Sequence, residues 1–271
     1  MEKIIALALA LIFVLSFAAC GKKETAKDEN VLRVAASPVP HAEILAECAK
    51  ILEEDGIKLE IKEFSDYVVP NTAVEEGEQD VNYFQHEPYM NQFNEEKGTH
   101  LVSVAKIHYE PMGIYAGKTK SIADLPDGAV IAVPNDPTNE ARALQLLVAQ
   151  GLIELKPDAG LNATPIDITS NPKNIEIKEL EAAMLPKAVD EVDLSVINSN
   201  YAMAAGFTPS KDALASESAD SEAAQTFANV VAVKEGDEKN EAVQKLVEVL
   251  TSDAIRDFIN EKYGGSVVPI F

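Results

Sequence analysis

The feature that most constrains the fold of this chain is a regular alternation of short apolar segments with longer segments whose apolar residues recur at helical spacing. The segments with strand character in the first half are residues 31–36, 58–64, 80–85 and 101–106, with helical segments from about residue 40 to 54, at 66–77 and at 87–97 between them. Strands that alternate with helices in this way favour an α/β fold, in which helices cover both faces of a sheet.

The same alternation continues in the second half of the chain. Asp136 can accept hydrogen bonds at the start of a helix, Pro137 is favoured at the first helical position, and Gly151 marks the end of that helix. Further segments with strand character are residues 129–133, 164–168, 175–179, 193–197 and 230–233, and two helical segments, 238–251 and 253–263, close the chain.

This organisation predicts two lobes rather than a string of linked domains. The sequence after residue 30 contains no internal repeat and no Gly/Ser-rich linker. The lobes would therefore be joined by strands that cross between them near residues 111–116 and 228–233. We expect lobe 1 to comprise residues 31–112 plus 230–271 and lobe 2 to comprise residues 113–229. In such folds ligands bind outside the carboxyl ends of the strands, in the cleft between the lobes.

The N-terminus indicates export and lipid attachment. An uncharged stretch follows Lys3 and is shorter than the roughly 20 residues that a spanning helix needs, which predicts a signal peptide over residues 1–19. Residues 16–21 (Ser-Phe-Ala-Ala-Cys-Gly) resemble a bacterial lipobox, which implies cleavage before Cys20 and diacylglycerol on its thiol. The polar residues 20–30 would then tether the fold to the extracytoplasmic face of the cell membrane. A plain signal peptide or an uncleaved anchor is the alternative.

Charge and cysteine content exclude two classes of protein. The chain has 23 Lys+Arg against 45 Asp+Glu, a formal net charge of −22, and so acidic a surface repels the phosphates of nucleic acids. Its two cysteines are too few for a disulfide framework. Cys48 recurs at helical spacing with Ile44 and Leu52, which predicts a buried core residue; a catalytic nucleophile is the alternative.

Ring side chains gather just after two neighbouring strand segments. Tyr67 follows the segment 58–64, and Phe84, His86 and Tyr89 close the segment 80–85. Such rings form an apolar wall that also suits a polarizable sulfur atom. We interpret them as candidates for one wall of the cleft, the alternative being core aromatics and a hydrogen-bonded structural histidine.

Polar residues of the second half are suited to an amino-acid zwitterion. Arg142 lies early in its helix, where the helix dipole disfavours a cation, and a bound carboxylate held by the guanidinium fork would resolve this conflict. The alternative is a surface arginine paired with Glu140 or another neighbour. The amide oxygens of Asn198, Asn200 and Asn229 can accept hydrogen bonds from an ammonium group, although a single Asn at a strand end is usually a turn former.

At these residues the chain resembles the methionine-binding lipoproteins of the NlpA/MetQ family, the substrate-binding components of ABC importers. The matching stretches are residues 38–44, 66–71, 83–89, 110–115, 133–142, 171–174 and 196–198. The strings FQHEPY (residues 84–89) and VPNDPTN (residues 133–139) are the most specific of them. The resemblance runs in order from about residue 31 to residue 271.

The resemblance implies a two-lobed periplasmic-binding-protein fold that closes on methionine and hands it to an ABC transporter permease, with no cofactor and no catalysis. It assigns the ligand carboxylate to Arg142, and the ammonium to Asn198 and Asn229. The side chains that it places around the thioether are those of Tyr67, Phe84, His86 and Tyr89, and it adds Tyr201 to the site. The family pattern is altered at residues 199–200 and 225–228, which leaves D-methionine, L-methionine, methionine sulfoxide and a methionine-like peptide open as ligands.

Other functions remain as alternatives. A binding protein for another amino acid or a short peptide would have the same fold. A metal-binding lipoprotein would use some of the four histidines, which show no ligand-like spacing: His41, His86, His100 and His108. An enzyme on the same fold would need a catalytic string, and the sequence contains no Ser/His/Asp string, no paired-carboxylate motif and no phosphate loop.

Overall fold

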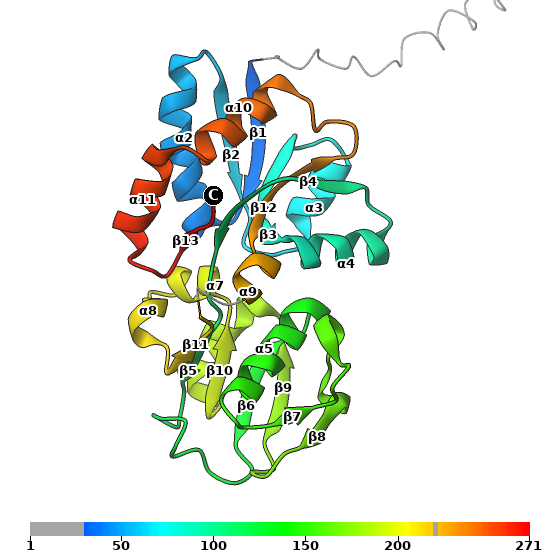
Figure 1. The fold of residues 1–271 in the computed structure, drawn as a ribbon, viewed down its shortest axis with the longest axis vertical. Coiled ribbons are helices and arrows are strands. Elements are labelled where there is room, and N and C mark those ends of the chain that lie inside the picture. The colour runs from blue at the N-terminus through cyan, green and yellow to red at the C-terminus, as the bar shows by residue number, and fades with distance from the viewer. Residues whose placement is uncertain (1–29, 219–221) are drawn as a thin grey trace, which may run out of the picture.

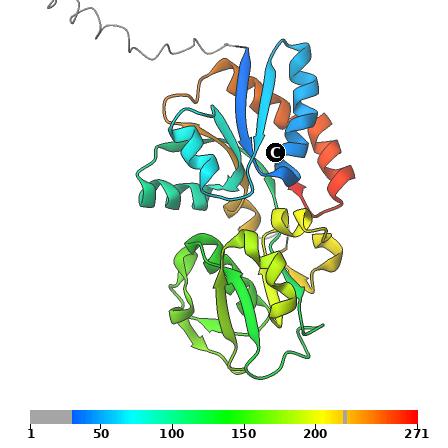
Figure 2. The same ribbon diagram turned by 180° about the vertical axis from the view of Figure 1, so that it is seen from behind.

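The protein consists of two α/β lobes that lie end to end (Figure 1; Figure 2). The structure is a computed structural model that describes residues 30–218 and 222–271. The predicted signal peptide (residues 1–19), Cys20 and nearly all of the predicted tether (residues 20–30) lie outside the described residues. Among the helices that the structure does describe, none is long and apolar enough to cross a bilayer.

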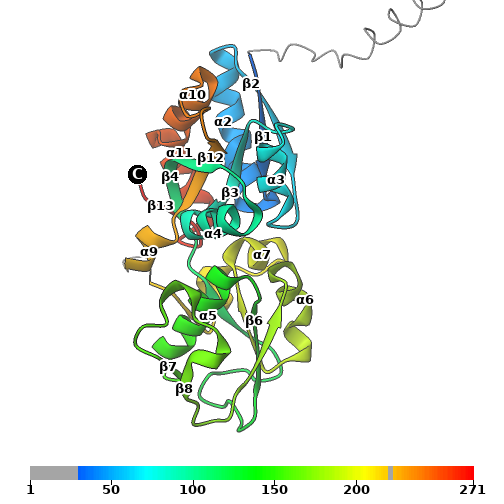
Figure 3. The ribbon, with the colours of Figure 1, turned by 90° about the vertical axis from the view of Figure 1, so that its right-hand side faces the viewer.

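The first lobe is built on a six-stranded mixed sheet. Its strands are, in sheet order, β13 (Val268–Pro269), β4 (Leu101–Tyr109), β12 (Asn229–Lys234), β3 (Val81–His86), β1 (Val31–Ala36) and β2 (Lys58–Glu63). One face is covered by α2 (Glu43–Glu54), α10 (Glu241–Leu250) and α11 (Asp253–Tyr263), and the other by α3 (Val69–Glu75) and α4 (Glu87–Lys97) (Figure 3). Alternate residues of β12 therefore enter different cores: Val231 and Val233 pack under α2 and α10, and Val230 and Ala232 pack under α3 and α4.

The second lobe has a five-stranded sheet and a separate two-stranded ribbon. The strands of the sheet are, in order, β11 (Ala215–Ser216), β5 (Gly113–Ala116), β10 (Leu194–Ile197), β6 (Val130–Pro134) and β9 (Glu176–Leu180), and the ribbon pairs β7 (Glu154–Leu155) with β8 (Ile168–Ser170). Helix α5 (Pro137–Ala149) packs on one face of the sheet, and α6 (Leu185–Ala188) and α7 (Ser199–Ala204) pack on the other. Two short helices, α8 (Pro209–Asp212) and α9 (Glu222–Thr226), are accompanied by short turns of π-helix, η1 (Pro38–Ala42), and of 3-10 helix, η2 (Gly160–Asn162), η3 (Pro165–Asp167), η4 (Ala182–Met184) and η5 (Val189–Glu191).

The predicted α/β class is confirmed, and most predicted elements are found within a few residues of their expected bounds. Helix α4 ends at Gly98, which has the left-handed φ of 68° expected of a glycine C-cap. Asp136 caps α5 as predicted, since its side chain accepts a hydrogen bond from the backbone N–H of Asn139.

One predicted strand is wrong. Residues 164–168 were expected to be extended, but Pro165–Asp167 forms a 3-10 turn and β8 begins only at Ile168. The turn has a local cause. The side chains of Thr164 and Asp167 form a reciprocal capping box around it, and Pro165 supplies a fixed φ at its first position.

Buried Cys48 confirms the prediction that this cysteine is a core residue. Its side chain is fully buried within the core between α2 and the first sheet, and burial raises the pKa of its thiol to about 12. A thiol that stays protonated and inaccessible is not a nucleophile, so the catalytic alternative finds no support in its surroundings.

Candidate functional site

A cavity lies where the two lobes meet, and both lobes contribute to its wall. The first lobe supplies residues from β3, α4, β12 and the loop before α3, namely Tyr67, Phe84, Gln85, His86, Tyr89 and Asn229. The remaining lining residues are Glu110, just after β4, and Asn139, Arg142, Asn198, Ser199 and Asn200 from α5, the end of β10 and α7. Every predicted site residue except Tyr201 is among them.

The aromatic side chains form one continuous wall of the cavity. The ring of Tyr67 lies 5.9 Å from that of Phe84 and 5.7 Å from that of Tyr89, measured between ring centroids. Tyr201 packs against Tyr67 with a centroid separation of 4.9 Å, and its hydroxyl donates to the backbone oxygen of Ser65. Tyr201 thus supports the wall from behind and does not line the cavity.

His86 joins the aromatic wall to the polar end of the cavity. Burial, followed by the nearby Arg142 guanidinium, lowers the pKa of His86 to about 3, so its ring is neutral at physiological pH. Its Nδ1 accepts the backbone N–H of Tyr89 (3.1 Å), which leaves Nε2–H to donate to Oδ1 of Asn139 (3.1 Å). His86 is therefore a fixed, uncharged hydrogen-bond donor that links β3 to α5.

Arg142 is buried and forms a bidentate ion pair. Its Nε donates to Oε1 of Glu217 (2.8 Å) and its Nη2 to Oε2 of the same carboxylate (2.6 Å), with only 4% of the Arg142 side chain exposed. The expected alternative of a surface arginine paired with Glu140 is wrong. Although burial alone would lower the pKa of Arg142, the Glu217 carboxylate raises it above its usual range, so the guanidinium is charged.

Two further contacts hold the Arg142 guanidinium in the site. Its Nη2 donates to the backbone oxygen of Glu110 (2.8 Å), and the ring of Phe227 lies 4.5 Å from its central carbon. Phe227 also packs edge-on against His86, with 5.2 Å between ring centroids. These contacts fix the position of the guanidinium at the junction of the lobes, next to the residues that form the aromatic wall.

The three asparagines differ in which atoms remain available. Asn198 donates through Nδ2 to Oδ1 of Asn139 (2.8 Å), and its own Oδ1 is buried without a hydrogen-bond partner among the described residues. Oδ1 of Asn229 meets Nε2 of His41 (2.9 Å), and Oδ1 of Asn200 accepts the hydroxyl of Tyr67 (2.6 Å). Asn198 consequently offers the clearest free acceptor at the polar end of the cavity.

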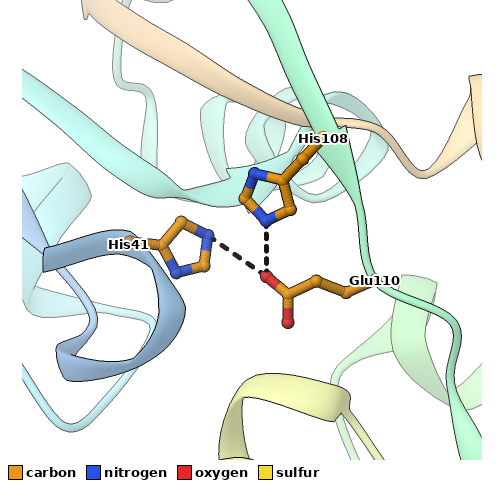
Figure 4. Close-up of side chains that lie close together, drawn as sticks. All are labelled: His41, His108 and Glu110. Atoms are coloured by element: carbon orange, nitrogen blue, oxygen red, sulfur yellow. Dashed lines mark hydrogen bonds and ion pairs between the residues drawn. The ribbon is translucent and has the colours of Figure 1, made fainter. Parts of the chain in front are cut away.

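His41, His108 and Glu110 form a buried cluster (Figure 4), and Glu110 also lines the cavity. Nε2 of His108 lies 2.8 Å from Oε1 of Glu110, and Nε2 of His41 lies 3.4 Å from the same oxygen. Burial lowers the pKa of His41 to about 4 and that of His108 to about 3, so both rings are neutral. Of the histidines considered for a metal site, His86 has other partners, and His100 is an exposed partner of Glu75.

Four lining residues were not predicted, and two positioning residues were missed with them. Those that line the cavity are Gln85, Glu110, Asn139 and Ser199, and those that hold Arg142 are Glu217 and Phe227. Three of the lining residues lie inside stretches that match the family, namely Gln85, Glu110 and Asn139. The family resemblance therefore pointed to these positions but assigned none of them a contact with the ligand. Nothing local marks Glu217, because its partner lies 75 residues away in the chain.

Two α/β lobes that enclose a cavity with a polar end and an aromatic wall define a substrate-binding protein of the periplasmic type. The model of the NlpA lipoprotein family matches residues 32–271, and the chain belongs to that family. It is 42% identical to the methionine-binding lipoprotein MetQ of Bacillus subtilis, covering 100% of this chain and 99% of the relative.

Solved structures agree with this assignment. A lipoprotein from Ruminococcus gnavus is 55% identical, with a TM-score of 0.89, 89% of this chain and 100% of that chain being covered. A nutrient-binding protein from Burkholderia cenocepacia, solved bound to methionine, is 43% identical with a TM-score of 0.84 and covers 89% and 100% of the two chains. The fold predicted from the sequence is thereby confirmed.

Proposed function

We propose that this protein binds methionine in the cavity between its lobes and delivers it, chemically unchanged, to an ABC importer. One observation carries the proposal: a charged guanidinium, a free amide oxygen and a wall of aromatic rings line one cavity. An amino acid with a long, polarizable apolar side chain presents the complementary groups in the same order. The relatives named for methionine binding support this ligand.

The polar end of the cavity would bind the zwitterion. Nη1 of Arg142 is the guanidinium nitrogen that the bonds to Glu217 and Glu110 do not engage, so it would donate to the ligand carboxylate. Oδ1 of Asn198 would accept from the ammonium group, with Asn229 beside it. Phe84, Tyr67, His86 and Tyr89 would surround the thioether.

Capture would depend on the lobes closing over the ligand. Hydrogen bonds between the lobes, from Tyr67 to Asn200 and from His86 to Asn139, join walls of the cavity that come from different sheets. A ligand that contacts both walls would favour this closed arrangement, because it adds contacts that the separated lobes cannot make. The closed form would then dock on the permease.

The lobe bounds and the anchor complete the proposal. The chain leaves the first sheet after β4 and returns to it at β12, which supports the expected lobes of residues 31–112 plus 230–271 and of residues 113–229, except that Asn229 as the first residue of β12 belongs with the first lobe. A diacylglyceryl group on Cys20 would hold the protein at the extracytoplasmic face of the membrane, as the family description implies.

Titration calorimetry of the purified full-length chain in detergent tests the proposed ligand. We expect saturable 1:1 binding of L-methionine, with leucine bound at least about tenfold more weakly because it lacks the sulfur. D-Methionine, methionine sulfoxide and Gly-Met would be titrated in parallel to decide among the methionine-like ligands. Equal binding of leucine, or no binding of any methionine compound together with tight binding of zinc, would contradict the proposal.

A further inference from the structure

Glu110 is a buried carboxylate that faces the cavity. Only 6% of the residue is exposed, and it lies immediately after β4, where the chain passes from one sheet to the other. Nε2 atoms of His108 and His41 converge on its Oε1, and the backbone N–H of Asn200 donates to the carboxylate. Figure 4 shows its second oxygen pointing away from both rings.

The imidazole rings fix the carboxylate without neutralising it. The hydroxyl of Tyr83 bonds to Nδ1 of His108, so this ring, when neutral, carries its proton on Nε2 and donates it to Glu110. His41 shares its Nε2 contact between Glu110 and Oδ1 of Asn229. The two rings are thus neutral donors that orient Glu110 and Asn229 together at the edge of the cavity.

Glu110 lacks the cationic partner that the buried carboxylate of Glu217 has. Glu217 is paired bidentately with Arg142, whereas Arg142 bonds only to the backbone oxygen of Glu110. In the part of the chain that the structure describes, no Lys or Arg forms an ion pair with the Glu110 carboxylate. Burial raises the pKa of Glu110 even though His41 and Arg142 nearby oppose the rise, and a cation that entered the cavity would further stabilise the ionised form.

A metal ion is the less favoured cation for this cluster. The ligand-type atoms of His41, His108 and Glu110 lie within 4.8 Å of one another, which is a spacing that zinc could bridge. A histidine bound to zinc nearly always donates its other N–H to a partner, but Nδ1 of His41 is buried with no partner among the described residues. The cavity that Glu110 lines also has an aromatic wall, which suits an organic ligand better than a bare metal ion.

Building on the proposed function, we infer that Glu110 is a specificity-determining residue whose carboxylate, oriented by His41 and His108, receives the α-ammonium group of the ligand. The ammonium would lie between this carboxylate and Oδ1 of Asn198, opposite the guanidinium of Arg142. The site would then reject compounds that keep the carboxylate and the thioether but lack a positive charge on the α-nitrogen.

The test combines Glu110→Gln with a change in the ligand. The full-length wild type and the variant are titrated with L-methionine and with 4-(methylthio)butanoate, which lacks only the amino group. We expect the variant to bind methionine at least about 30-fold more weakly, since an ammonium would lose its buried counter-charge. Its affinity for 4-(methylthio)butanoate should stay the same or increase.

Glu140→Gln is the matched control, because Glu140 is a second buried carboxyl, on α5 in the second lobe, that does not line the cavity. This variant should bind both ligands as the wild type does. Equal weakening of both ligands by Glu110→Gln would show a merely structural role and overturn the inference. Stoichiometric zinc binding that Glu110→Gln abolishes would also overturn it, in favour of a metal centre.

A second variant and the wild-type titration separate the possible outcomes. If circular dichroism shows that Glu110→Gln does not fold, Glu110→Asp replaces it: the retained charge should preserve the preference for methionine, and equal affinity for the two ligands would overturn the inference. A wild type that binds no methionine refutes the proposed function itself. A wild type that binds methionine with no selective loss in the variant refutes only the role of Glu110.

Discussion

Replacing Glu217 by Gln tests whether the buried ion pair holds the lobe junction together. The Glu217 carboxylate accepts two hydrogen bonds from Arg142, one from the hydroxyl of Tyr109 (2.6 Å) and one from the backbone N–H of Met112 (2.8 Å). Glutamine has nearly the same shape, but its NH₂ group faces donors, and the buried guanidinium loses its counter-charge.

The expected cost follows from the burial of both partners, whose side chains are 4% and 10% exposed. Breaking a buried ion pair by removing one charge destabilises a protein by about 3–5 kcal/mol. For a chain of this size we expect the melting temperature to fall by about 6–20 °C. Urea unfolding followed by far-UV circular dichroism measures the free energy directly.

The effect should also depend on pH in a defined direction. Burial alone would raise the pKa of Glu217, but pairing with Arg142 outweighs it and the pKa is lowered from its usual value of 4.5. The pair therefore stabilises the fold above about pH 4.5, and this contribution is lost as the pH falls through the lower pKa of the folded state. The difference in stability between wild type and variant should shrink below pH 4.5.

An exposed ion pair provides the control. Glu248 contacts Lys245 at 3.0 Å but is 70% exposed, so Glu248→Gln should change the free energy of unfolding by less than about 1 kcal/mol. If Glu217→Gln costs no more than this control, the reasoning that Arg142 depends on Glu217 is refuted.

Two further predictions concern the aromatic wall and a buried carboxyl. Phe84→Ala should weaken methionine binding at least about tenfold, because the ring is buried against the cavity and its removal enlarges the space around the thioether; calorimetry showing unchanged affinity would remove Phe84 from the site. Burial and the nearby Glu179 raise the pKa of Glu140 to about 8, so the folded state gains stability as the pH falls from above 8 towards 4.5. Urea unfolding at pH 8.5 and pH 6 should show this gain in the wild type and a smaller one in Glu140→Gln, and identical gains would contradict the assignment.

Local signals in the sequence account for most of the elements and for much of the site. Asp136 and Gly98 mark helix ends through interactions within a few residues, which is why their effects could be read in advance. The strand predicted at residues 164–168 is wrong, since a proline and a capping box outweighed the apolar pattern there. Arg142 was identified as an unusual residue from its place in a helix, although its partner was not.

Which charged residues meet within the site could be seen only in the tertiary structure. Glu217 is 75 residues from Arg142, and Glu110 meets His41 only because the fold brings the residue after β4 close to the turn that precedes α2. No local rule connects such residues, so the sequence indicated neither the ion pair nor the histidine-bound carboxylate.

The amino-acid sequence by itself determined the α/β class, the aromatic wall and the family, because these depend on periodicity and on short stretches of neighbouring residues. Only the tertiary structure decided which charges are compensated, because burial and pairing depend on segments brought together from both lobes. That is the physical reason why the sequence suggested Arg142 as a candidate, while it gave no sign of the buried carboxylate of Glu110 beside it.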